Sequence, residues 1–86
     1  MAHRWLVVRD HRQLLVSVDT DAPLSDVETD ALADMVSSRL LLENVIEVVL
    51  IGPKRFGDTR HSNFNAVART VGRLATTAGT AFRIAH

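Results

Sequence analysis

The chain has 86 residues, of which 47% are apolar and 23% are charged, and its 10 basic and 10 acidic residues balance to a formal net charge of zero. A chain of this length forms one domain, residues 1–86, with a thin core. The absence of cysteine excludes disulfides and cysteine-based zinc sites. Uncharged apolar runs such as Val48 to Ile51 are far shorter than the roughly 20 residues of a membrane span. Since no leader pattern begins the chain, we expect a cytoplasmic protein that does not enter the membrane.

The first two predicted elements are short strands, at 4–9 and 13–18. Both are rich in apolar and β-branched residues, and the polar residues 10–12 between them are typical of a tight hairpin turn. From Leu14 to Val18 every second residue is a large apolar one. This alternation predicts one buried and one partly exposed face of the second strand.

A helix is predicted next, because Ser25 and Glu28 have the spacing of a capping box. It runs to about Glu43, where Asn44 provides a left-handed stop. The apolar surface of this helix is wider than the part that packing against one sheet would bury, notably at 40–42. We expect part of this surplus to form an interface.

Residues 45–51 predict the central strand. The run is almost continuously apolar and contains five β-branched residues, which is typical of a parallel strand covered on both faces. Gly52 and Pro53 end it. A polar loop follows, up to His61.

The last two predicted elements are a helix and a strand. The helix begins near Ser62 or Asn63, and apolar residues from Phe64 onward recur at helical spacing. Gly79 ends it because glycine readily adopts a positive φ. Residues 80–85 then form the final strand.

The order ββαβαβ predicts an α/β fold: a small domain with a mixed sheet of about four strands and two helices packed on it. In such sheets, binding sites form beyond the carboxyl ends of the strands. The loop at 52–61 is the one long, residue-rich connection in that position. It is therefore the candidate site.

This loop brings Asp58 and Thr59 to the start of a helix, where free amides and the helix dipole favour a phosphate group. It is neither a Walker loop, which ends in Gly-Lys-Ser/Thr, nor a dinucleotide fingerprint. In the simpler interpretation Asp58, Thr59 or Ser62 caps the helix and has no further role.

Phe56, Asp58 and Thr59 match part of a Phe-x-Asp-Ser/Thr-x-Gly motif that follows an apolar strand and precedes an amphipathic helix. Over residues 45–84 the chain resembles the second half of STAS domains, the family of anti-sigma-factor antagonists and sulphate-transporter tails. It departs from the motif at His61, where the family has glycine, and at Ser62, where the family usually has an apolar residue. The resemblance implies a non-catalytic module of signalling or transcription regulation in which Thr59 is the phosphorylation switch.

The charges around Thr59 are compatible with such a switch. A phosphate on Thr59 adds about −1.5 to −2 charges beside Arg55 and Arg60, and the same charge opposes an acidic partner surface. The predicted partner is a protein, either a kinase or a regulator. The predicted contact residues are Arg55, Phe56, Asp58, Thr59, Arg60 and His61.

Nucleic-acid binding is an alternative. Arg69 and Arg73 lie one helical turn apart, and the preceding loop adds further bases, so that one basic face would run along loop and helix. This face comprises Lys54, Arg55, Arg60, Arg69 and Arg73. A pI near neutrality and 5% aromatic residues count against it.

Catalysis and metal binding have little support in the sequence. Asp58 and His61, three residues apart, have the composition of an acid–base pair, but no nucleophile or second acid accompanies them. The four histidines are scattered without metal-ligand spacing. We expect neither an enzyme nor a bound metal or cofactor.

Self-association is the remaining alternative. Residues 18–51 hold eight acidic residues and one arginine, a net charge of −7, whereas residues 52–86 hold six basic residues and one acid, a net charge of +5. Complementary patches on a chain whose net charge is zero favour pairing with a second copy. The apolar surplus on the first helix favours it as well, so we expect a homo-oligomer.

Overall fold

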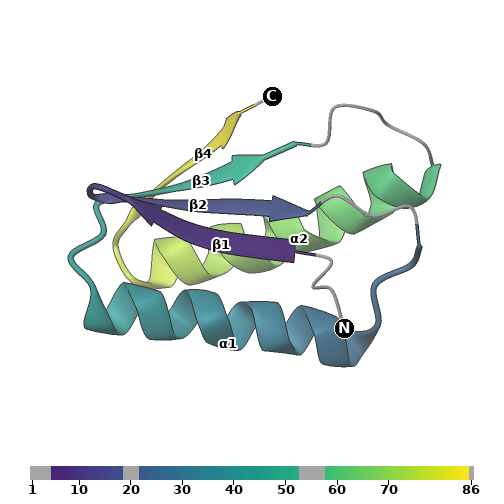
Figure 1. Ribbon diagram of the computed structural model, residues 1–86, viewed down its shortest axis with the longest axis horizontal. Helices are drawn as coiled ribbons and strands as arrows, with labels where there is room; N and C mark the ends of the chain where they lie inside the picture. Colours follow the sequence, from purple (N-terminus) through teal and green to yellow (C-terminus); the bar gives the residue numbers. More distant parts are fainter. Residues whose placement is uncertain (1–4, 19–21, 53–57, 86) are drawn as a thin grey trace.

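Four strands form a single sheet and two helices pack on it (Figure 1). The structure is a computed structural model and describes residues 5–18, 22–52 and 58–85. In chain order the elements are β1 (Trp5–Asp10), β2 (Gln13–Val18), α1 (Asp26–Leu42), β3 (Glu47–Ile51), α2 (Asp58–Thr77) and β4 (Ala81–Ala85). The predicted ββαβαβ order and the mixed sheet with two helices are confirmed.

The strand order β1-β2-β3-β4 determines where the helices lie. β1 and β2 pair antiparallel, whereas β2, β3 and β4 are parallel neighbours that need crossover helices. Both crossovers step along the sheet in the same direction, and since such connections are right-handed, both helices lie on the same face (Figure 1). β3 is interior with parallel neighbours, as predicted. Cover was expected on both of its faces, but among the described residues helices cover one face only.

The core lies between the sheet and the two helices. Every second residue of β2 is buried, and Val48 and Leu50 of β3 continue the same face. Trp5 is partly buried at its edge. The helices contribute Leu32, Val36, Phe64, Val67, Val71 and Ala75.

The ends of α1 follow from local hydrogen bonds. The Ser25 hydroxyl accepts from the Glu28 amide at 3.1 Å, and the Ser25 amide donates to Glu28 Oε1 at 3.3 Å, which confirms the capping box. At the other end the prediction of a left-handed Asn44 is wrong: α1 ends at Leu42, and Glu43 is extended, with φ −119°. Glu43 caps the carboxyl end of the helix instead. Its amide donates to the Arg39 carbonyl, and its carboxylate accepts from the Arg39 guanidinium at 3.1 Å.

Two other boundaries differ from those predicted. β3 begins at Glu47 rather than at 45, because the amide of Ile46 donates to the Arg12 carbonyl in the hairpin turn. α2 begins at Asp58, four residues before Ser62, since polar residues are tolerated in a first turn whose amides have no helical partner. Gly79 has φ +70° just beyond α2, as predicted.

Candidate functional site

The candidate site is divided between residues that the structure describes and residues that it does not. Lys54, Arg55 and Phe56 lie outside the described residues. Asp58 is the first residue of α2, and Thr59, Arg60 and His61 complete its first turn. The expectation of a loop through His61 is therefore wrong from Asp58 onward. The structure brings these four residues together on one helical turn at the carboxyl end of β3 (Figure 1).

The first turn of α2 presents its side chains in different directions. Thr59 is half-buried and His61 is exposed. Arg60 is half-buried, and it precedes the buried Phe64 by four residues and the buried Val67 by seven, so it lies toward the core side of α2. The turn offers a hydroxyl beside amides that have no acceptor within the helix, at the positive end of the helix dipole.

Asn63 anchors this turn, and the sequence reasoning did not single it out. Its side chain is buried, with 6% of the residue exposed. Asn63 Nδ2 donates to the Ala22 carbonyl at 2.9 Å, and its Oδ1 accepts from the Leu24 amide at 3.2 Å. The connection between β2 and α1 is thereby joined to α2. Its spacing in the sequence could have indicated its burial. Asn63 lies four residues before Val67 and therefore on the same side of the helix as the buried apolar residues of α2.

The sheet face opposite the helices carries a patch of apolar side chains. The pairing register places Leu6 and Val8 of β1, Leu15 of β2, and Val49 and Ile51 of β3 on this face. Val49 is only 2% exposed, because it lies between Leu15 and Arg83 in the register. By contrast, Leu6 is 59% exposed and Val8 is 41% exposed. No described helix covers this surface, which we call the open face and define by these five residues.

A polar cluster borders the open face at the amino ends of the parallel strands. Gln13 Nε2 donates to Glu47 Oε1 at 2.8 Å, and Arg83 approaches the same carboxylate at 3.4 Å. These contacts connect β2, β3 and β4. The charged groups of this cluster lie toward one end of the face, whereas Leu6 and Ile51 lie at the other end, where α2 begins, with Ser17 between them in the register.

The predicted basic face is only partly assembled. Arg69 and Arg73 are exposed one turn apart on α2, but Arg60 lies on the opposite, core-facing side of the helix. A hollow of about 480 Å³ beside Arg69 is lined by Ser62, Asn65 and Ala68. Two arginines and three polar or small side chains thus form the described part of this surface.

Within residues 5–18, 22–52 and 58–85, no group of three or more histidine, aspartate or glutamate side chains is placed to hold a metal ion. None of the helices in these ranges combines the length and hydrophobicity that crossing a membrane requires.

Comparison with known proteins assigns no role to these residues. No protein-family model, curated protein or solved structure matches this chain.

Proposed function

We propose that the protein is a cytoplasmic, non-catalytic regulatory module that binds another protein through the carboxyl end of its sheet. The observation that carries this proposal is the open face. Contiguous apolar side chains at the surface of a small domain mark interaction sites, because their exposure to water is unfavourable. Leu6 and Ile51 place the apolar end of the open face at the same end of the sheet as Thr59.

The position of Thr59 supports regulation by phosphorylation. Thr59 is the second residue of α2, where the amides of the first turn have no helical acceptor. A phosphate there gains hydrogen bonds and a favourable dipole, while its charge disfavours an apolar or acidic partner at the neighbouring open face. The resemblance of residues 45–84 to STAS domains supports the same role for Thr59.

Affinity capture with tagged variants tests the proposal. Leu6→Glu places a charge in the open face, and because Leu6 is exposed the fold tolerates it. We expect Leu6→Glu and Thr59→Glu to lose a protein partner that the wild type and Thr59→Ala retain. Leu42→Glu, on the exposed end of α1, is the matched control and retains the partner.

The opposite outcome would favour nucleic acid. If all these variants kept the same partners, and if binding to a labelled oligonucleotide fell steeply with salt and vanished in Arg69→Ala and Arg73→Ala, the basic residues of α2 would be the functional surface. Salt discriminates between the two functions because phosphate contacts release counterions, whereas an apolar interface responds weakly to salt.

A further inference from the structure

The outer face of the helical layer carries opposite charges on its two helices. On α1, Asp30 and Asp34 are exposed, each displaced by two residues from the buried Leu32 and Val36 and therefore on the opposite side of the helix. On α2, Arg69 and Arg73 are exposed and stand in the same relation to the buried Val67 and Val71. No ion pair among the described residues neutralises these four side chains. An acidic stripe and a basic stripe thus lie side by side on one surface.

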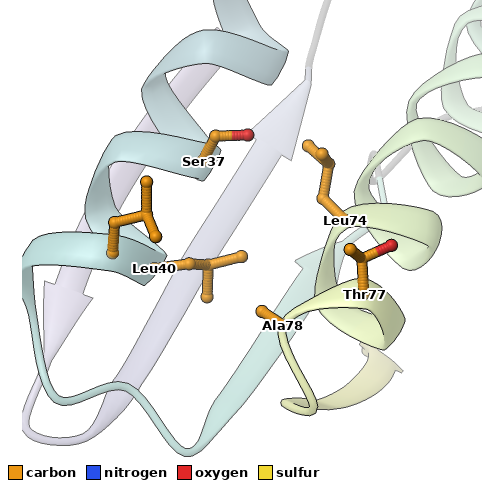
Figure 2. A pocket seen from close by; sticks show the side chains of 6 residues that line it. Ser37, Leu40, Leu74, Thr77 and Ala78 are labelled. Carbon is orange, nitrogen blue, oxygen red and sulfur yellow. The ribbon is translucent and has the colours of Figure 1, made fainter.

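An apolar groove lies between the two helices at their carboxyl ends (Figure 2). Its volume is about 240 Å³, and Leu40 and Leu74 face each other across it. Leu41 lies at its rim and is 84% exposed. The complete lining is Ser37, Leu40, Leu41, Leu74, Thr77 and Ala78.

The groove also shows which positions of α1 and α2 lie at the same height along the helix axes. α1 and α2 run in the same direction, and Leu41 shares the groove with Thr77 and Ala78 (Figures 1 and 2). Asp34, seven residues before Leu41, is therefore level with positions 70–71 of α2, between Arg69 and Arg73. At a rise of about 1.5 Å per residue, Asp34 lies within about 4 Å of both arginines along the helix axis.

We infer that this outer face is a homodimer interface with a two-fold axis parallel to the helices. A rotation about such an axis places α1 of one copy over α2 of the other. It leaves the position of every residue along the helix direction unchanged. Asp34 then lies between Arg69 and Arg73 of the second copy, and each Leu41 enters the space between the two facing grooves. Two equivalent sets of ion pairs then lie about 10 Å along the helices from the apolar contact.

A second copy is the partner that this surface fits best. The surface presents an acidic stripe and a basic stripe side by side, with an apolar groove between the helices at their carboxyl ends. A two-fold rotation matches each stripe with its complement and brings the two grooves together. The zero net charge of the chain adds no repulsion between copies. This interface lies on the helices, across the core from the open face, and does not rest on the function proposed above.

Sedimentation equilibrium at low and high salt tests the dimer, with circular dichroism to verify folding. We expect the wild type to dimerise at micromolar concentration, and Asp34→Arg or Arg73→Asp to raise the dissociation constant about tenfold or more, because each reversal acts twice in a symmetric interface. The double variant Asp34→Arg/Arg73→Asp restores most of the loss, since the exchanged charges again attract each other.

Leu41 and Leu42 provide a matched apolar pair. They are adjacent, and 84% and 85% exposed, but only Leu41 lines the groove. Leu41→Asp weakens the dimer and Leu42→Asp does not. A monomeric wild type at high micromolar concentration, equal effects of the two leucine variants, or a double charge exchange that restores nothing would each overturn the inference. Dissociation by Leu6→Glu would instead place the dimer contact on the open face, whereas loss of a different protein partner in that variant concerns only the proposed function.

Discussion

Replacing Asn63 with alanine tests how the first turns of α2 are held to the rest of the molecule. The change removes a donor to the Ala22 carbonyl and an acceptor for the Leu24 amide. Leaving a buried polar group without its partner costs about 1–3 kcal/mol. Ala22 and Leu24 are half-buried, so water reaches them and the lower end of this range applies to each. The two lost hydrogen bonds together reduce the free energy of unfolding by about 2 kcal/mol.

Asn65→Ala is the matched control for this substitution. Asn65 lies two residues further along α2 and is exposed, so both variants gain the same helix propensity but only one loses tertiary hydrogen bonds. Urea denaturation monitored by circular dichroism measures the difference. With a slope of about 1 kcal/mol per molar urea, the Asn63→Ala midpoint lies about 2 M below that of Asn65→Ala. Equal midpoints would show that the hydrogen bonds of Asn63 do not stabilise the fold.

Three further substitutions test the local structure in the same denaturation assay. Gly79→Ala destabilises by about 1–2 kcal/mol, because alanine tolerates φ +70° poorly. Gly72→Ala has the opposite sign: its added Cβ lies 3.4 Å from the Phe82 ring, an ordinary contact, and it gains up to about 1 kcal/mol of helix propensity. A larger loss at Gly72 than at Gly79 would contradict this account. Ser25→Ala removes the capping box of α1 and costs about 1 kcal/mol, whereas Ser38→Ala, exposed within the same helix, does not destabilise; equal losses would refute the cap.

The two proposed interfaces correspond to apolar side chains that the packed layers leave exposed. Two helices on one face of a four-stranded sheet leave the other face of the sheet and the outer sides of the helices without cover from the described residues. Leu6 and Leu41 remain at the surface on opposite layers. A partner protein on the open face and a second copy on the helices would each cover one of these surfaces.

Local signals in the sequence determined most of the elements. The alternation from Leu14 to Val18, the capping pair Ser25 and Glu28, and the position of Gly79 each act over a few neighbouring residues, and each is present in the structure as predicted. The boundaries at Asn44 and Ser62 were misplaced, because hydrogen bonds of Glu43 and the permissive first turn of α2 competed with the local preference.

Tertiary structure alone decided which surfaces remain uncovered. The sequence of β3 shows that both faces of the strand are apolar, but the direction of the crossovers decides that both helices lie on one face and leave the other open. In the same way, the sequence shows acidic residues on α1 and basic residues on α2. Only the packing of the helices around one groove sets the level of Asp34 relative to Arg69 and Arg73 from which the dimer is inferred. The pairing of Asn63 with residues 22 and 24 also spans about 40 positions of the chain. Local periodicity reports which side chains need burial, but distances between distant segments depend on how the elements pack.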